Sequence, residues 1–137
     1  MKDSADGAPL TWERLTPYTD RRGESYTLPS AALEYLNAVR ETHVATIIPG
    51  GTRGNHAHPH HRETLVVLCV DDWWLLWESP DGTRHEEEIE GPGAVVIRID
   101  AGVPHAVRNA GAGPLVIVSM SDRAGQDPGD TVRHALE

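Results

Sequence analysis

The sequence predicts an all-β protein, an antiparallel sandwich or barrel with one short helix near its N-terminus. From residue 42 onward, short apolar runs recur at spacings of roughly ten residues, and turns rich in glycine and proline separate them. This spacing leaves no room for the crossover helices that parallel strands need. The 137 residues suit one domain, and 39% hydrophobic with 24% charged residues is a globular balance.

Residues 1–41 are predicted to form an N-terminal arm and a short helix that pack on the barrel. Residues 1–27 are polar and rich in turn residues, which favours a loosely structured arm with one or two edge strands. Residues 29–40 carry apolar side chains at three- and four-residue spacing after Ser30, a residue type that caps helices. We therefore expect the helix there.

The barrel is predicted to occupy residues 42–121, followed by a polar tail at 122–137. Strands are expected at 44–48, 54–58, 63–70, 73–78, 84–89, 94–99, 105–109 and 115–119. The tryptophans of the strand at 73–78 are expected to pack in the core and in a homodimer. The acidic run 86–88 is expected on a solvated strand edge. The end of the tail, 131–136, is expected to form a helical turn or to be mobile.

Composition disfavours several kinds of partner. The chain has 21 acidic and 12 basic residues and a net charge of -9, which disfavours nucleic acid. No apolar run reaches the roughly 20 residues of a membrane span, and the first residues lack the apolar core of a signal peptide. We therefore expect no membrane partner and a cytoplasmic protein. The single cysteine, Cys69, is expected in the core and fits a reducing compartment.

Histidines gather at one place in the sequence. His56 and His58 are separated by one residue, so on a strand both side chains leave the same face. A turn follows, and Glu63 opens the next strand, so a hairpin would bring its carboxylate back to the imidazoles. His105 begins a later strand and could reach the same place across the barrel. Three imidazoles and one carboxylate suit a divalent ion of zinc, nickel, iron, manganese or cobalt, with positions left for water or substrate.

Two stretches resemble the two sequence motifs of the cupin family. Residues 51–63 read GTRGNHAHPHHRE, a histidine pair followed by glutamate, and residues 102–109 read GVPHAVRN. The resemblance covers the half of the chain from 51 to 109. It implies the RmlC-like jelly-roll barrel of the cupins. It also implies that the metal ligands are His56, His58, Glu63 and His105.

A narrower resemblance concerns the activity. The strings DRRG at 20–23 and TRGNHAH at 52–58 are similar to the cupin domain of capsular polysaccharide reductase-epimerases and, more loosely, to cupin nucleotide-sugar epimerases and ketoisomerases. In those enzymes the cupin moves a proton next to a keto group of a deoxysugar. The resemblance implies Lewis-acid and proton-transfer chemistry on an oxygenated small molecule in sugar or natural-product biosynthesis, as an epimerase, ketoisomerase or cyclase.

Individual residues are assigned to this chemistry. His105 and His60 are the candidate catalytic groups, although the turn residues His60 and His61 are expected to face solvent or the barrel rim. The candidate substrate contacts are Arg53, Asn55 and Asn109; the guanidinium of Arg53 suits a carboxylate or phosphate.

Other functions stay open at this point. A metal-free cupin would use His105 or His56 as a base. An iron-dependent cupin dioxygenase would activate oxygen at the same four ligands, and a non-catalytic cupin would only bind a small ligand.

Overall fold

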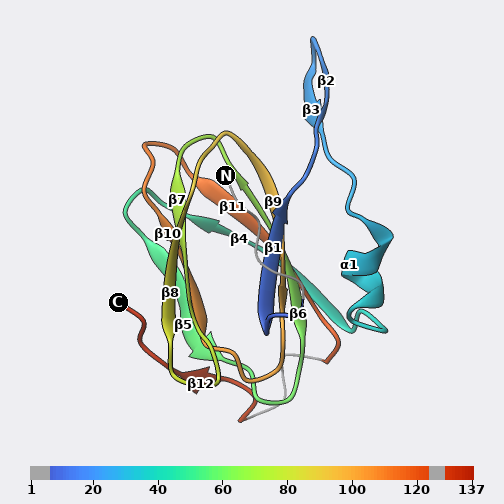
Figure 1. Ribbon diagram of the computed structural model, residues 1–137. Coiled ribbons are helices and arrows are strands. Elements are labelled where there is room, and N and C mark those ends of the chain that lie inside the picture. The colour runs from blue at the N-terminus through green and yellow to red at the C-terminus, as the bar shows by residue number, and fades with distance from the viewer. Residues whose placement is uncertain (1–6, 124–128) are drawn as a thin grey trace.

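The structure, a computed structural model, describes residues 7–123 and 129–137. Two five-stranded antiparallel sheets face each other and form a jelly-roll barrel (Figure 1). The first sheet has the order β1 (Leu10–Arg14), β9 (Gly93–Ile99), β6 (Glu63–Cys69), β11 (Leu115–Ser121), β4 (Glu41–Ile47). The second has the order β12 (Val132–Arg133), β5 (Thr52–Ala57), β10 (His105–Asn109), β7 (Trp73–Glu78), β8 (Arg84–Ile89). The predicted fold class is confirmed.

The core lies between the two sheets because alternate residues of their strands are apolar. Along β11 the pattern of buried and half-buried residues alternates strictly, as it must where one face packs on the core. Cys69 is buried at the end of β6, as expected. The largest side chains enclosed between the sheets include Trp73, Leu75, Val67, Val95 and Ile97. Each such side chain stabilises the fold by about 1.5–3 kcal/mol relative to exposure.

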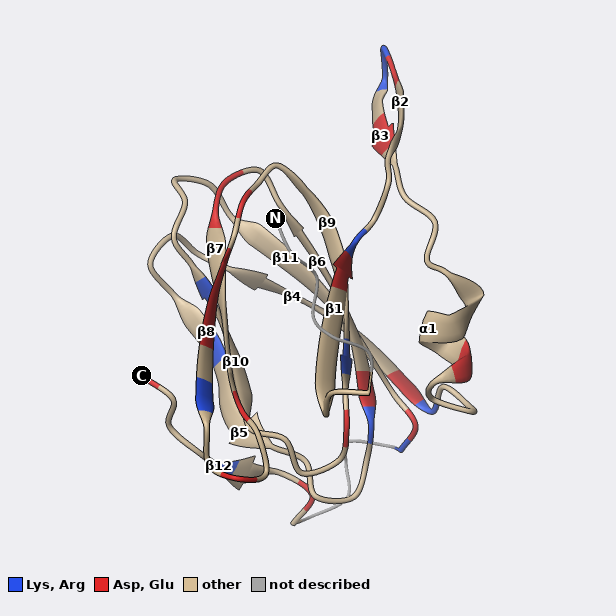
Figure 2. Ribbon diagram, viewed as in Figure 1, with Lys and Arg blue, Asp and Glu red and all other residues tan. Residues whose placement is uncertain are grey.

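A half-buried acceptor joins the two sheets along the edge formed by β1 and β8. The indole of Trp12 donates to Oε2 of Glu87 at 2.8 Å, and the indole of Trp77 approaches the same oxygen at 3.4 Å. Acidic residues follow β8 (Figure 2). The prediction of a solvated edge holds for Glu86 and Glu88, which are exposed. It is wrong for Glu87, because strand alternation turns this residue toward the opposite sheet.

The N-terminal region contains a predicted edge strand and a helix that is shorter than predicted. β1 pairs with β9 along its whole length and is the edge strand of the first sheet. The helix α1 spans only Ser30–Glu34, and a hairpin of β2 (Tyr18–Asp20) and β3 (Gly23–Ser25) precedes it, extending away from the barrel (Figure 1). The helix cannot continue to residue 40 because Asn37 has a φ of 63°, outside the helical region. Residues 1–6 of the arm lie outside the described residues.

The end of the chain is extended and packs against the second sheet. β12 pairs with β5, and Leu136 packs with Leu76, Ala106 and Trp74. A helical turn at 131–136 is therefore not formed, because backbone pairing with β5 satisfies this segment instead. The outer face of β7 is covered by the chain's own terminus, so the tryptophans give no reason for a dimer. Residues 124–128 of the tail lie outside the described residues. No described helix has the length and apolar character to cross a membrane.

Candidate metal-binding site

A β-bulge in β5 places the two histidines of the first motif. His105 pairs with His56 and Ala106 pairs with Gly54, so Asn55 is an extra residue on β5. Both bulge residues have positive φ, 104° at Gly54 and 55° at Asn55. A Cβ at Gly54 would lie 2.6 Å from the backbone oxygen of His105, so only glycine fits against β10. The bulge thereby sets the direction of the His56 side chain.

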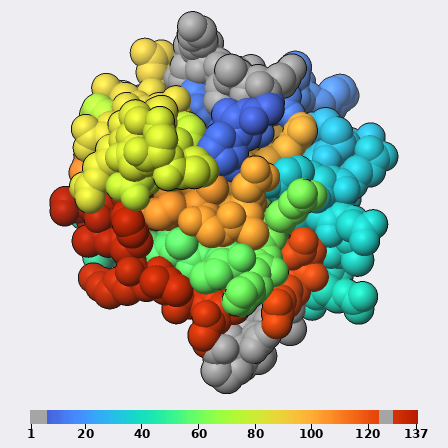
Figure 3. All heavy atoms as spheres, turned by 60° about the horizontal axis from the view of Figure 1, so that its bottom comes forward, coloured from blue at the N-terminus to red at the C-terminus, as the bar shows by residue number. Residues whose placement is uncertain are grey.

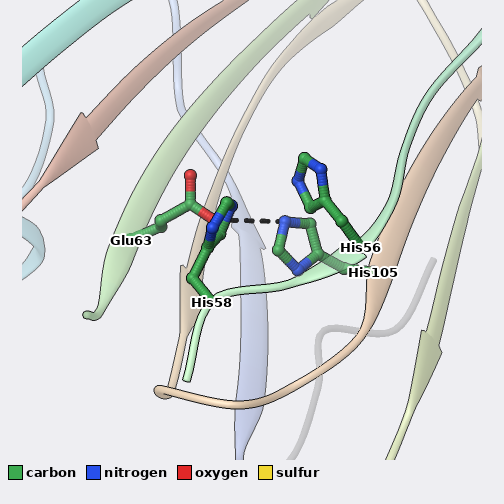
Figure 4. Close-up of side chains that lie close together, drawn as sticks. All are labelled: His56, His58, Glu63 and His105. Atoms are coloured by element: carbon green, nitrogen blue, oxygen red, sulfur yellow. Dashed lines mark ion pairs between the residues drawn. The ribbon is translucent and has the colours of Figure 1, made fainter. Parts of the chain in front are cut away.

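The four predicted ligands meet inside the barrel. His56 comes from β5, His58 follows the end of β5, Glu63 is the first residue of β6 and His105 the first of β10. Each offers a ligand atom, and all these atoms lie within 4.8 Å of one another. The four side chains point toward one another (Figure 4). Oε1 of Glu63 lies 3.3 Å from Nε2 of His58 and 3.2 Å from Nε2 of His105.

Hydrogen bonds fix the tautomers of two rings. Nδ1 of His58 lies 2.9 Å from the backbone oxygen of Asp130, and Nδ1 of His105 lies 2.9 Å from that of Val103. A carbonyl oxygen only accepts, so both Nδ1 atoms carry the proton, and both Nε2 atoms of the neutral rings present lone pairs to Glu63.

The resulting set of donors fits a divalent cation. Within the described residues, Oε1 of Glu63 is buried and has no hydrogen-bond partner, while Oε2 accepts from Ser119 at 3.1 Å. A buried carboxylate oxygen that faces two nitrogen lone pairs is stabilised only by a positive charge between them, either a proton or a metal ion. Backbone carbonyls that hold the Nδ1 protons are also the usual support of metal-binding histidines.

The charges of the cluster shift the pKa values of its members. Burial lowers the pKa of His56 to about 4, and the neighbouring imidazoles add to this effect. Burial raises the pKa of Glu63, but contact with His105 and the charges of the imidazoles outweigh burial and bring it to about 2. Burial opposes protonation of His105, yet the contact with Glu63 raises its pKa. At neutral pH His56 is therefore neutral and Glu63 ionised, which are the forms that bind metal ions.

A pocket of about 460 Å³ opens onto the cluster. Its polar wall includes Arg53 and His43, and its apolar wall includes Leu65, Val107 and Ile117. Nε of Arg53 donates to the backbone oxygen of Thr46 at 2.8 Å, which orients the guanidinium at the pocket wall. The pocket therefore offers a cation and an apolar surface to a small ligand that reaches the cluster.

The other predicted site residues lie elsewhere. His60 is exposed and is not among the residues that line the pocket. Asn109 is buried and uses its amide on Ile47, Gly111 and Gly113, which leaves it no polar atom for a substrate. The side chain of Asn55 contacts Leu136 and Glu137 of the C-terminal segment. Neither asparagine is among the residues that line the pocket, and their assignment as substrate contacts stays a prediction.

The sequence did not predict the positions of three residues near the site. His43 lines the pocket from β4. The alternation of His43, Ala45 and Ile47 along this strand could have predicted that the His43 side chain faces the same side as the buried Ile47. His61 is buried with 6% exposure instead of facing solvent, because the carboxylate of Asp130 accepts a hydrogen bond from its ring. Nothing in the local sequence indicates that Asp130, far along the chain, reaches this place.

Comparison with known proteins gives one relative by sequence and several similar solved structures. No family model matches. Over 70 residues the chain is 40% identical to the β-alanine degradation protein BauB of Pseudomonas aeruginosa, an alignment that covers 51% of this chain and 67% of that protein.

Solved structures share the fold at low identity. The sugar 3,4-ketoisomerase QdtA of Thermoanaerobacterium thermosaccharolyticum, solved with TDP, has 17% identity and a TM-score of 0.67 over 92% of this chain and 88% of its own. The RmlC epimerase of Mycobacterium tuberculosis has 14% identity and a TM-score of 0.72 over 96% and 72%. The capsular polysaccharide assembling protein CapF of Staphylococcus aureus has 22% identity and a TM-score of 0.61 over 88% and 34%.

Proposed function

Because this chain is a cupin and belongs to the family of BauB, we propose that it is an enzyme that transfers a proton next to a carbonyl group of an oxygenated small molecule. Epimerases, ketoisomerases and cyclases share this step. The observation that carries the proposal is the pocket with three imidazoles and a carboxylate directed at one point of its wall. Proton transfer needs a base and an acid that are held beside the substrate.

We propose that His56, His58, Glu63 and His105 hold a divalent metal ion, for which their lone pairs and the unpartnered oxygen of Glu63 are suited. A bound ion of this kind polarises a carbonyl oxygen as a Lewis acid. The chain itself orients the ligand atoms through the hydrogen bonds to Asp130 and Val103. In the metal-free alternative, His105 or His56 is the base. The pKa of His56, about 4, leaves its ring unprotonated at neutral pH but makes it a weak base, and the experiment below tests this alternative.

The candidate proton carrier outside the cluster is His43. Among the described residues, it is the imidazole that lines the pocket without belonging to the four ligands. It lies opposite Ser119 in the pairing of β4 with β11, and Ser119 in turn contacts Glu63. His43 thus borders the same space as the cluster, and histidine is the side chain most often used for general acid and base catalysis.

The pocket favours an anionic substrate with a compact carbon skeleton. Arg53 supplies a planar cation, and Leu65, Val107 and Ile117 supply an apolar wall. Two substrate classes have support from the comparisons. They are nucleotide-linked keto sugars, as the TDP complex of the ketoisomerase QdtA suggests, and short β-amino acids, as the name of BauB suggests.

Exchange of substrate hydrogens with solvent tests the proposal. The protein, loaded in turn with zinc, nickel, iron, manganese or cobalt or left metal-free, is incubated under nitrogen in D₂O with compounds of both classes. NMR then follows deuterium uptake at the carbon next to the carbonyl. We expect uptake by the wild type and none by His105→Ala. Exchange at full rate in the metal-free protein would overturn the metal proposal and leave the proton-transfer proposal intact.

Two outcomes would overturn proton transfer itself. Oxygen uptake by the iron-loaded protein in air, with no deuterium uptake under nitrogen, would identify the dioxygenase alternative. Ligand binding without turnover of any compound would identify a non-catalytic binding protein.

A further inference from the structure

A buried aspartate near the C-terminus contacts three residues of the segment that joins β5 to β6. The backbone oxygen of Asp130 accepts from Nδ1 of His58 at 2.9 Å. Its carboxylate accepts from the backbone N–H of His60 at 2.7 Å and from Nδ1 of His61 at 2.5 Å. Asp130 is 2% exposed, although it is separated from these residues by about half the chain. One residue therefore binds both the backbone and two rings of this segment.

The contact with His61 also bears on His58. The rings of His58 and His61 are stacked, with centroids 4.2 Å apart and an angle of 21° between their planes. Since Asp130 accepts from the His61 ring, it fixes the surface on which His58 rests. The orientation of His58 thus depends on Asp130 twice, through its backbone oxygen at Nδ1 and through its carboxylate by way of His61.

The segment that carries Asp130 is attached to β5 beyond this contact. Val132 pairs with Ala57, and the backbone N–H of His134 donates to the backbone oxygen of Asn55 at 2.7 Å. The N–H of Leu136 donates to the Asn55 side chain at 2.9 Å. In Figure 3 the red C-terminal segment lies along the green residues around position 60. Asp130 is therefore held in place by a paired backbone rather than by its side chain alone.

We propose that Asp130 is a positioning residue for the candidate metal site. It holds the His58 ring with the proton on Nδ1, so that Nε2 is the atom offered to the ion. The metal-binding consequence rests on the proposed function, whereas the tautomer and orientation of His58 do not.

The ring geometry explains why this contact matters. Nδ1 and Nε2 lie on different edges of an imidazole, and Nε2 of His58 faces Glu63 at 3.3 Å while Nδ1 faces Asp130. Without an acceptor at Nδ1, the neutral ring can place its proton on Nε2 and donate to Glu63, which blocks the atom that a metal ion needs. Asp130 removes this competing arrangement. Thr131 contributes a weaker contact, with its hydroxyl 3.3 Å from the same Nδ1.

The first measurement needs no variant. Long-range ¹H–¹⁵N NMR of metal-free wild-type protein labelled on histidine reports which nitrogen of His58 is protonated. We expect the Nδ1-protonated form. Observation of the Nε2-protonated form would overturn the proposal whatever the variants do.

The second measurement compares Asp130→Ala and Asp130→Asn with the wild type. Zinc affinity is measured by competition with a chromogenic chelator, and folding by circular dichroism. Both variants keep the backbone oxygen at Nδ1 of His58, so they should keep its Nδ1-protonated form, and they lose the carboxylate that holds the His61 ring. Because the surface on which His58 rests is then no longer fixed, we expect zinc affinity to fall about 10-fold or more, the usual effect of losing support for a ligand. Asp130→Asn keeps the shape and one acceptor, so it should fold even if Asp130→Ala does not.

Asp122→Asn is the matched control. Asp122 accepts from the backbone N–H of Arg62 at 3.0 Å, so it supports the same segment without touching an imidazole. This variant should keep the wild-type zinc affinity and tautomer. Folded Asp130 variants that behave like the control would overturn the proposal. A wild type that binds no zinc while His58 is Nδ1-protonated would overturn the metal site and leave the orienting role of Asp130 standing.

Discussion

Gly54→Ala tests the idea that the bulge in β5 builds the site. Two costs add at this position. The φ of 104° is unfavourable for alanine and costs about 1–2 kcal/mol. The new Cβ would also lie 2.6 Å from the backbone oxygen of His105 and 2.8 Å from Cα of Ala106, and relief of such an overlap costs about 1–3 kcal/mol more. We expect the free energy of unfolding to fall by about 2–5 kcal/mol.

Gly82→Ala separates the two costs. Gly82 lies in the turn between β7 and β8 with a φ of 87°, and nothing lies within 4 Å of its added Cβ. This control should lose only the conformational part, about 1–2 kcal/mol, and keep its metal affinity.

Urea unfolding and zinc competition measure the stability and the affinity of both variants. Because Gly54 faces the backbone of His105, relief of the overlap moves β5 away from β10 and separates His56 from His105. We expect zinc affinity to fall at least about 10-fold, as when ligand support is lost. Equal losses of stability in the two variants, or unchanged zinc affinity in a folded Gly54→Ala, would refute the reasoning.

Four further predictions concern the site and the assembly. His105→Ala should keep its circular dichroism spectrum and lose turnover by more than about 100-fold, since it removes a ligand rather than its support; near-normal turnover would contradict this. Arg53→Ala should weaken substrate binding about ten- to a hundredfold, because it removes a charge-assisted contact of about 1.5–3 kcal/mol, and kcat should change little. An unchanged KM would show that Arg53 does not touch the substrate. The metal-free protein should lose stability in acid in two steps. Between pH 6.5 and about 4, His56 is protonated in the unfolded chain but not in the folded one, and from about pH 4.5 to 2 the same holds for Glu63. A free energy of unfolding that stays constant from pH 6.5 to 2 would contradict this prediction. We also expect a homodimer, with the outer edge strand β4, its exposed Val44 and the adjacent exposed Ile48 as the contact surface. A mass near 15.0 kDa by light scattering at every concentration would exclude the dimer.

The sequence determined the strands of the barrel and the members of the cluster. Each strand predicted between residues 44 and 119 is present, with ends shifted by a few residues at most, because alternation of apolar side chains and turns of glycine and proline are local features. His56, His58 and Glu63 are close in the sequence, but the predicted hairpin is wrong. β5 and β6 belong to opposite sheets, and the crossing of the chain from one sheet to the other brings Glu63 to the two imidazoles. The sequence showed that His105 could reach them across the barrel, and the resemblance of its motif assigned it as the fourth ligand.

Tertiary structure decided everything that depends on two distant segments meeting. Asp130 and His61 form a buried pair across 69 positions, and Trp12 and Glu87 join across 75, so no local pattern marks them. Residues 131–136 were predicted to form a helical turn or to be mobile because nothing near them in the sequence offers hydrogen-bond partners. Their partners lie on the edge of β5, which exists only in the folded barrel. A polar residue is buried where a partner satisfies it, and the choice of partner is made by the pairing of strands rather than by the residues on either side.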